Sequence, residues 1–530
     1  MIDTLSGPRS YLLYILLLII VCFMVFGATI NHGFVWDDGG YHLLQNPYLQ
    51  KLSFNNLTHF WTNQYQGMYI PVSYTCIMFI TWISRIFTST LFNPGIFHFF
   101  NILMHCLNSL LLFFLLKRIF KQDLAVFFGT IVFMLHPVQV EAVAMVTEFR
   151  GLLATFWGIL FLLKYDRLLR NNTYRLLRLV FCLLLFVLAI LSKPVAMVFF
   201  PIALLYSLLV LKTPLKKLGT LHIFLFFISL IAIYMTTASQ PGFVIQYLTP
   251  LFNRFFIWMD AVNFYLCKIL IPLGLSPSYA RTPQVVLDFW YTYVAWLIPI
   301  GLLIILFIKR KRIPFVLFAF LVFITGFLPV SGIVPFIFQN WSTVADRYLY
   351  IPMIGIAFLI TFFLTKYPQR IFKILCAILV IIYGILSSVV YLPVWESNLR
   401  LWSHCIEVTP QEANAYYNRG NAFLRQKEYG KANRDFEKAI ELDPSFRKAL
   451  YKKGFLLLGQ KKFDAAIDYF DAILSLDPEF AIAYTAKAVA YYYKKEYEKA
   501  WLEVNKARSR GIPVNAHFIK TLNNAIDKVD

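Results

Sequence analysis

Two adjacent carboxylates, Asp37 and Asp38, follow closely after the first apolar run of the chain, Tyr11 to Ile30. That run is long enough to cross a bilayer, so the pair lies just beyond the end of an expected membrane helix. Adjacent like charges repel each other and need water or a cation nearby. The pair is therefore a candidate for an active-site base, or for a metal or other cation site, at the membrane face. A solvated acidic loop would also explain it.

Acidic residues are scarce in the first 395 residues, and seven of the ten fall on the expected outer side of the membrane. Carboxylates are costly near hydrocarbon and tend to be functional there. The distribution fits an outward-facing polar site, although chance together with solvated loops would also produce it. The seven are Asp37, Asp38, Glu141, Glu148, Asp260, Asp288 and Asp346.

Three cations expected on the same side, Arg150, Lys193 and Arg347, are candidates for holding an anionic lipid head group. Arginine suits a phosphate because its planar fork donates two parallel hydrogen bonds. A structural salt bridge with a nearby acid explains each cation equally well. His136 is a further candidate, but a histidine before proline is more often structural and could simply cap a helix end.

The composition is that of a polytopic α-helical membrane protein. The chain has 530 residues, of which 59% are hydrophobic and 15% charged, and its mean hydropathy is +0.64. We expect the first run to be retained rather than cleaved as a signal peptide. Eleven membrane spans are predicted, near 11–30, 97–117, 124–136, 150–165, 176–192, 195–211, 220–236, 291–308, 314–330, 348–365 and 371–391.

Two further apolar segments do not fit this count. Residues 252–271 could form a span but would break its parity, so we expect a re-entrant or interfacial helix on the outer side. Residues 69–87 read as a similar juxtamembrane helix, within a long first outer loop, residues 31–93. An odd number of spans with a cytoplasmic N-terminus places the C-terminus outside.

Charge supports this topology. The net charge is +21, and the first 395 residues hold 27 basic and 10 acidic residues. The basic residues form short clusters between apolar runs, which is the positive-inside signal rather than a nucleic-acid surface.

The seven cysteines have no spacing typical of zinc sites or disulfides, and no phosphate-binding or HExxH motif is present.

The C-terminal part is a repeat array. Asp443-Pro444 recurs 34 residues later as Asp477-Pro478, and small residues at 420, 454 and 488 share this period. A 34-residue period of this kind is typical of tetratricopeptide repeats, which offer a concave face to polypeptides. We predict about three repeats from Asn414 to Gly511, after a half repeat from Leu401 to Pro410. The expected domains are 1–395 in the membrane and 396–530 outside it.

The order of motifs resembles one family. FVWDD, followed by Asn46-Pro47, then HPVQVEAV, LSK, ADRYLYIP and the repeats, is similar to the transmembrane and tetratricopeptide-repeat O-mannosyltransferases, a branch of the GT-C glycosyltransferases. The resemblance implies a polyprenyl- or dolichyl-phosphate-linked sugar donor and a reaction on the outer or lumenal face. It implies that Asp37 or Asp38 acts on the acceptor, that His136 and Glu141 line the site, and that Arg347 lies near the lipid phosphate.

Two departures from the family pattern bear on the donor sugar. Pro194 follows the lysine of the LSK motif, where relatives carry an acid, and Ile70-Pro71-Val72 stands where they have Arg-Pro-Leu. The array is also shorter than in animal members, which favours a bacterial protein. The expected location is then the bacterial inner membrane, with the repeats outside the cytoplasm, or the endoplasmic reticulum membrane in a eukaryote.

The expected function is transfer of a sugar, with mannose favoured, from a polyprenyl-phosphate carrier to a Ser or Thr hydroxyl of an exported polypeptide held by the repeats. Asp38 is slightly preferred over Asp37 as the base. The sequence leaves open whether this pair binds a divalent cation. No nucleic-acid partner is expected. Alternatives are a GT-C enzyme that acts on a lipid or cell-wall glycan, and a membrane-anchored repeat scaffold without activity. A transporter is disfavoured because the acids lie at one face and no paired repeat of spans is evident.

Overall fold

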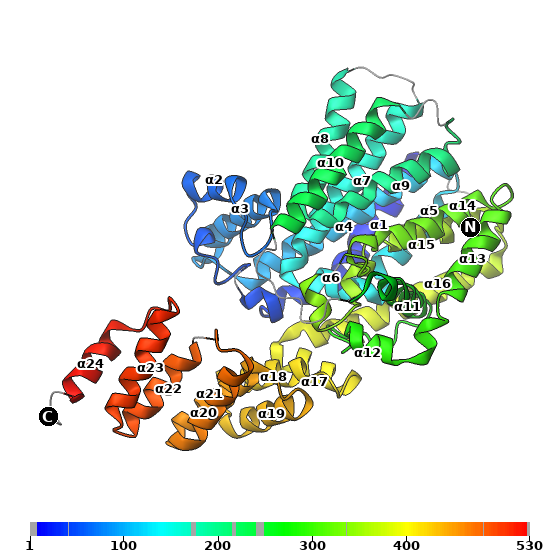
Figure 1. Ribbon diagram of the computed structural model, residues 1–530. Helices are drawn as coiled ribbons and strands as arrows, with labels where there is room; N and C mark the ends of the chain where they lie inside the picture. The colour runs from blue at the N-terminus through cyan, green and yellow to red at the C-terminus, as the bar shows by residue number, and fades with distance from the viewer. Residues whose placement is uncertain are drawn as a thin grey trace. The chain divides into compact units, whose positions relative to one another are not determined.

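The computed structural model describes residues 8–40, 42–170, 176–214, 219–239, 249–334, 336–480 and 482–526. Over these ranges the regular structure is entirely helical, which confirms the predicted all-α class (Figure 1). The chain divides into two compact units, residues 1–401 and 402–530, where the sequence predicted a boundary at 395.

The first unit is a bundle of apolar helices joined by irregular segments (Figure 1). Its α-helices are α1 (Pro8–Phe26), α2 (Phe54–Thr62), α3 (Pro71–Thr88), α4 (Pro94–Ile119), α5 (Asp123–Leu135), α6 (Val140–Ala144), α7 (Phe149–Arg170), α8 (Leu176–Ser192), α9 (Phe199–Leu205), α10 (Thr220–Ala238), α11 (Leu251–Leu270), α12 (Pro283–Asp288), α13 (Leu297–Ile308), α14 (Pro314–Gly326), α15 (Met353–Lys366) and α16 (Arg370–Ile385).

Among the described residues, six helical segments are long and apolar enough to cross a bilayer: Tyr11–Asn31, Pro94–Ile119, Val146–Arg170, Leu221–Ala238, Trp290–Ile308 and Arg370–Glu396. The bent pair Asp123–Leu135 and Pro137–Ala144 makes a seventh. Shorter apolar helices occupy Leu176–Ser192, Pro194–Val210, Pro314–Val330 and Met353–Lys366. Each of the eleven predicted ranges therefore contains an apolar helix, and the number that cross the membrane stays a prediction.

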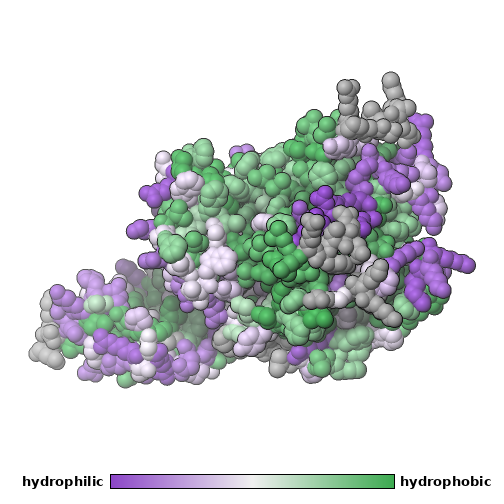
Figure 2. Space-filling view, turned by 90° about the horizontal axis from the view of Figure 1, so that it is seen from above, coloured by the Kyte–Doolittle hydropathy of each residue, from purple (hydrophilic) through white to green (hydrophobic). Residues whose placement is uncertain are grey.

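The outer faces of these helices are hydrophobic. Phe227, Ile308 and Ile381 are 55%, 71% and 62% exposed, and green, hydrophobic residues cover much of this unit in Figure 2. So large an apolar surface is unfavourable in water and is expected to face lipid.

The two segments that did not fit the span count are helical as well. Residues 252–271 fall on α11, and residues 69–87 fall on α3. The long first loop is thus partly helical, since it contains both α2 and α3. The position of α3 and α11 relative to the bilayer stays a prediction.

Helix α4 holds the irregular segments in place. Its start is fixed by Asn93, whose side chain accepts the N–H of Ile96, with Pro94 at the first position. Buried Asn101 donates to the carbonyl oxygens of Val143 and Met145, at 3.1 and 2.9 Å. In an apolar interior these amide groups satisfy carbonyls that lie outside regular helices. The segment after α5 is therefore fixed to α4 by polar contacts.

The second unit is a helical array. Its helices are α18 (Ala413–Arg425), α19 (Tyr429–Leu442), α20 (Arg447–Gly459), α21 (Phe463–Leu476), α22 (Ile482–Tyr493), α23 (Tyr497–Ser509) and α24 (Ala516–Ile526). They are preceded by α17 (Asn398–Val408), within which the boundary between the two units falls. The first six form three pairs, in agreement with the three predicted repeats. The final helix α24 has no counterpart in the sequence prediction.

The 34-residue period has a packing cause. A Cβ atom added at Gly420 or Gly454 would lie 2.7 Å from the ring of Phe436 or Phe470, so only glycine lets the paired helices approach this closely. The turn within each pair repeats too. Lysines at positions 427, 461 and 495 adopt φ of +62°, +60° and +62°, a left-handed conformation that costs about 1–2 kcal/mol for a residue with a Cβ atom.

Candidate functional site

Asp38 is fully buried and acts as an anchor. It lies in a short 3₁₀ turn, Trp36–Gly39. Its Oδ1 accepts the N–H of Thr147 at 2.8 Å, and its Oδ2 accepts the N–H groups of Val146 and Val35 at 3.2 and 3.3 Å. Burial raises the pKa of Asp38 to about 7, against the opposing effect of these three hydrogen bonds. The carboxylate therefore fastens the first loop onto the segment that leads into α7.

Asp37 is placed differently. It is half-buried, and its carboxylate makes no hydrogen bond or ion pair with the described residues. The residue before it, Trp36, has φ of +52°, and its N–H donates to Oδ1 of Asn398 at 2.8 Å. A non-glycine residue held in this conformation stores strain, which is common at functional sites. Of the two acids, Asp37 is the one whose oxygens remain available to a ligand.

A network of buried charges lies next to this loop. Arg347 donates from Nη1 to Glu141 at 2.5 Å and from its backbone N–H at 2.9 Å. Lys193 donates to Glu148 at 2.6 Å, while Arg150 and Arg347 lie 3.9 and 4.0 Å from the same carboxylate. Three cations thus face two carboxylates. When all five groups are ionised, the network carries one excess positive charge.

Arg347 joins the network to the acidic loop. Its guanidinium carbon lies 5.1 Å from the ring centre of Trp36, 4.4 Å from that of Phe338 and 5.0 Å from that of Tyr348. Aromatic faces attract guanidinium groups and hold them flat. The side chain is only 8% exposed, so Arg347 is fixed between Glu141 and the residue that precedes Asp37.

A small cavity of about 40 Å³ lies within the network, with Glu148, Lys193 and Arg347 in its walls. Gly151 shapes it, because a Cβ atom there would lie 2.7 Å from Oε2 of Glu148 and 3.4 Å from Nζ of Lys193. A volume of this size has room for a few water molecules. In this conformation the charges line a narrow space rather than an open cleft.

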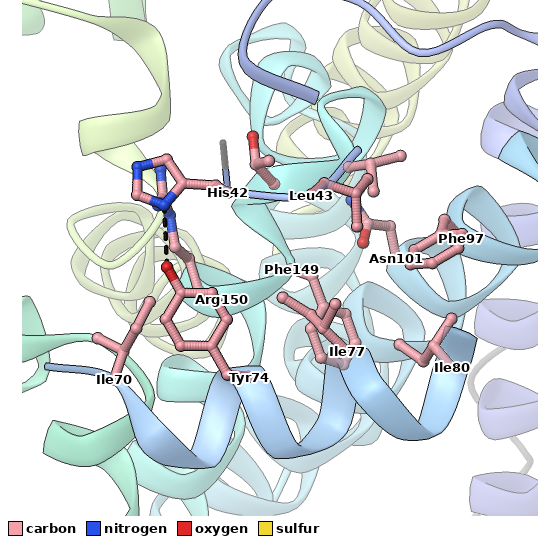
Figure 3. Close-up of a pocket in the computed structure, with 12 residues that line it drawn as sticks. His42, Leu43, Ile70, Tyr74, Ile77, Ile80, Phe97, Asn101, Phe149 and Arg150 are labelled. Carbon is pink, nitrogen blue, oxygen red and sulfur yellow. Dashed lines mark hydrogen bonds between the residues drawn. The ribbon is translucent and has the colours of Figure 1, made fainter. Parts of the chain in front are cut away.

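Arg150 also lines a second niche (Figure 3). Nδ1 of His42 and the hydroxyl of Tyr74 lie 2.9 Å apart. Burial, with a smaller effect of Arg150, lowers the pKa of His42 to about 3. The niche holds only about 10 Å³, and Thr147, whose N–H binds Asp38, also lines it. His42 and Tyr74 therefore line the same niche as the segment that anchors Asp38.

His136 does not join the charged network. Its Nε2 lies 3.0 Å from the carbonyl oxygen of Ile269, and its Nδ1 accepts the N–H of Val138 at 3.3 Å. The ring packs against Tyr383 with centres 4.5 Å apart. Since both ring nitrogens are used by backbone groups, the geometry fits the helix-capping role rather than a role in lining the site.

Two acids that the sequence analysis named only among the seven outer acids have defined contacts in the structure. Glu148 lies at the centre of the network, and its only sequence signal was its place among the outer acids. Buried Asp346 accepts the hydroxyl of Tyr279 at 2.7 Å, and burial raises its pKa to about 8. No group of three His, Cys, Asp or Glu residues that could hold a metal ion occurs in the described ranges.

The chain is similar to known proteins in two ways. Residues 413–446 and 451–511 match models of the tetratricopeptide repeat. "Protein O-mannosyl-transferase TMTC1" of Homo sapiens is 30% identical over 149 residues, which are 27% of this chain and 17% of that protein. "Protein O-mannosyl-transferase F38B6.6" of Caenorhabditis elegans is 25% identical over 340 residues, which are 61% of this chain and 47% of that protein.

These matches confirm the predicted repeats and the resemblance to tetratricopeptide-repeat O-mannosyltransferases. Each match covers less than half the length of the relative. A solved structure of MamA ("MamA RS-1 ArsTM double mutant") is 25% identical and covers 25% of this chain and 74% of that one, with a TM-score of 0.23, which is too low to support an inference.

Proposed function

We propose that this chain is an inverting GT-C glycosyltransferase that moves a sugar, with mannose favoured, from a polyprenyl-phosphate carrier to a Ser or Thr hydroxyl of an exported polypeptide. The observation that carries the proposal is the position of Arg347, which is held against Trp36 beside an available carboxylate, Asp37. An acid and an arginine so placed supply the two functions that this transfer needs.

Asp37 is the proposed base. The acceptor hydroxyl attacks C1 of the sugar, Asp37 takes its proton, and the bond between C1 and the phosphate oxygen breaks. Such general-base assistance contributes roughly 10²–10⁴-fold in rate. A pKa of about 7 would suit Asp38 to the same role, but Asp38 is fully buried and already accepts three N–H groups. We therefore assign the base to Asp37 and a positioning role to Asp38.

The charged network is the proposed phosphate site. A phosphodiester that links a sugar to a lipid carries one negative charge, which matches the excess charge of the network. When the bond to C1 breaks, the leaving phosphate gains a second charge, and cations fixed nearby stabilise it most at that point. Arg347 and Lys193 are the proposed contacts, and the carboxylates of Glu141 and Glu148 keep them oriented. Arg150 adds to the local positive charge.

The tetratricopeptide repeats are proposed to bind the acceptor polypeptide. Helix arrays of this class present a concave face suited to extended segments. Tethering an acceptor to the same chain as the site raises its effective concentration at Asp37. We place the repeats and the site on the outer or lumenal side of one membrane, as the basic loops of the sequence predict.

Transfer by this mechanism does not need a metal ion at the acidic pair. A divalent cation bridging Asp37 and Asp38 would compete with the three N–H donors that occupy the oxygens of Asp38.

The alternative acceptor, a lipid or cell-wall glycan, would use the same donor site and would not need the repeats.

The test is a transfer assay with purified protein, polyprenyl-phosphate-linked mannose and a panel of exported polypeptides. We expect a hexose mass increment on Ser or Thr with the wild type and with Asp288→Asn, a matched change at an exposed outer acid. We expect none with Asp37→Asn. A hexose increment found only on a lipid or a glycan would favour the alternative acceptor. If the wild type and Asp288→Asn transfer no sugar and do not bind the donor, the enzyme proposal is overturned in favour of a scaffold.

A further inference from the structure

A basic pocket lies at the end of α4 and α7 that is opposite to the charged network. These helices pack side by side. They run in the same direction, because Asn108 of α4 bonds to the carbonyl oxygen of Leu152 and Arg118, further along α4, bonds to that of Leu163. Arg167, near the end of α7, is 17 residues beyond Arg150, a helical distance of about 26 Å. This is close to the thickness of the hydrocarbon core of a bilayer. The pocket therefore belongs to the other membrane face, expected to be cytoplasmic.

Four cations surround the pocket, which has a volume of about 360 Å³. That volume lies within the range of ligand sites in proteins, about 300–1,000 Å³. The lining residues are Phe114, Lys117, Arg118, Leu160, Leu163, Lys164 and Arg167.

The floor of the pocket is rigid. Nη1 of Arg118 donates to the carbonyl oxygen of Leu163 at 3.1 Å and to Asp166 at 2.9 Å, which ties α4 to α7. Asp166 is fully buried and also accepts from Arg170 at 2.7 Å and from the hydroxyl of Tyr206 at 2.6 Å. Since its oxygens are used in this way, Asp166 does not neutralise the remaining cations.

Two of the cations have no acidic partner. Lys117 pairs with Asp123, but neither Lys164 nor Arg167 forms an ion pair with any carboxylate in the described part of the chain. The ends of α4 and α7 contribute about half a negative charge each, which is less than the charge of these two side chains. The pocket therefore keeps an excess positive charge that a bound anion would balance.

The walls indicate which anion. Phe114 is 41% exposed, lies one helical turn before Lys117 and forms the wall on the membrane side, together with Leu160. A soluble anion makes no favourable contact with an apolar wall. A phospholipid, by contrast, places its head group against cations and its acyl chain along such a surface. Basic loops that serve only as topology signals need neither a hollow nor this wall.

We propose that this pocket binds the head group of an anionic phospholipid, with Lys164 and Arg167 as the contacts that decide affinity. The site is separate from the sugar-transfer site and does not depend on the proposed function. A lipid bound there would join the ends of α4 and α7, whose opposite ends carry the segments that hold Asp38 and Glu148.

The test is native mass spectrometry of the delipidated full-length protein, titrated with phosphatidylglycerol or phosphatidylcholine. We expect phosphatidylglycerol to bind at least tenfold more tightly. Each basic residue near an anionic head group is worth roughly fivefold in affinity. Lys164→Gln/Arg167→Gln should therefore weaken phosphatidylglycerol binding about 25-fold. The matched control Lys309→Gln/Arg312→Gln, with the same charge change in another basic loop, should bind like the wild type.

Arg167→Gln alone keeps the test valid if the double variant does not fold, because this side chain is exposed and unpaired with acids; a loss of about fivefold is expected. Equal weakening in the control would show a general surface-charge effect and overturn the proposal. So would unchanged affinity in the pocket variants. Competition by millimolar inorganic phosphate as strong as by the lipid would assign the pocket to a soluble anion instead.

Discussion

Oδ1 of Asp38 accepts the backbone N–H of Thr147 at 2.8 Å, across 109 positions of sequence. With the N–H of Val146 on its other oxygen, Asp38 joins the first loop to the segment that carries Glu148 and Arg150. The adjacent acid, Asp37, takes no part in this contact. The two carboxylates of the pair therefore have different roles: Asp38 is structural, and Asp37 is available to a ligand.

Removal of the anchor should cost stability. Asp38→Ala leaves three buried N–H groups without an acceptor, and each such loss costs about 1–3 kcal/mol. We expect a clear drop in the thermal unfolding temperature in detergent, whereas Asp37→Ala should unfold within about 2 °C of the wild type. Equal melting of the two variants would contradict the anchor role.

Stability should also depend on pH through Asp38. Its pKa is raised from 3.8 to about 7 in the folded protein, so folding favours the protonated form. The contribution is complete below about pH 4 and is lost as pH rises through 7. We expect the unfolding temperature of the wild type to fall between about pH 4 and 7 and to level off above pH 7, and Asp38→Asn to show a flatter profile. Parallel profiles would assign the dependence to other groups.

Arg347 should not tolerate lysine. Lysine cannot donate from a planar fork to Glu141 or lie flat against Trp36, Phe338 and Tyr348. We expect Arg347→Lys to lower kcat/KM for transfer by roughly 10–100-fold, in line with the strength of charge-assisted contacts. Arg400→Lys, at a side chain 57% exposed, is the control and should retain full activity. Normal turnover by Arg347→Lys would exclude a specific role for the guanidinium.

Gly151 should be needed for the Lys193–Glu148 pair. A Cβ atom there would lie 2.7 Å from Oε2 of Glu148, so Gly151→Ala forces this carboxylate to move. We expect a higher KM for the lipid-linked donor with little loss of helix stability, because alanine favours helices. Gly301→Ala is a control, since nothing lies within 4 Å of the added atom. An unchanged KM would show that the pair does not shape the donor site.

The repeats offer a matched pair of glycines within α20. Gly454→Ala places a Cβ atom 2.7 Å from the fully buried ring of Phe470, whereas nothing lies within 4 Å of one at Gly459. We expect Gly454→Ala to destabilise its repeat by about 1–3 kcal/mol and Gly459→Ala to leave it unchanged. Amide hydrogen exchange over α20 and α21 in the full chain measures both. Equal protection in both variants would argue against tight packing at Gly454.

Sequence reasoning found the helices and the repeats because their signals are local. Apolar runs and a 34-residue period are visible in the order of residues along the chain. The helices α1 and α4 and the pairs from α18 to α23 could therefore be predicted without knowledge of tertiary contacts. Residues of the network could also be selected as outer-side charges, but not their partners: the Glu141–Arg347 contact spans 206 positions.

The division of labour within the acidic pair could not be read from the sequence. Asp37 and Asp38 are chemically identical, and only the approach of residues 146 and 147 distinguishes them. The same is true of His136, whose Nε2 lies 3.0 Å from the backbone carbonyl oxygen of Ile269, 133 positions away. Long-range backbone contacts of this kind leave no pattern in a single sequence.

The most direct test of the account compares Asp37→Asn with Asp38→Asn in the transfer assay, with the unfolding temperature of each variant measured in the same preparation. We predict that Asp37→Asn keeps the wild-type unfolding temperature and loses at least 100-fold in the rate of transfer. Asp38→Asn should melt at a lower temperature and keep measurable transfer below that temperature. Full activity in Asp37→Asn, with complete loss in a stably folded Asp38→Asn, would contradict the assignment of Asp37 as the base.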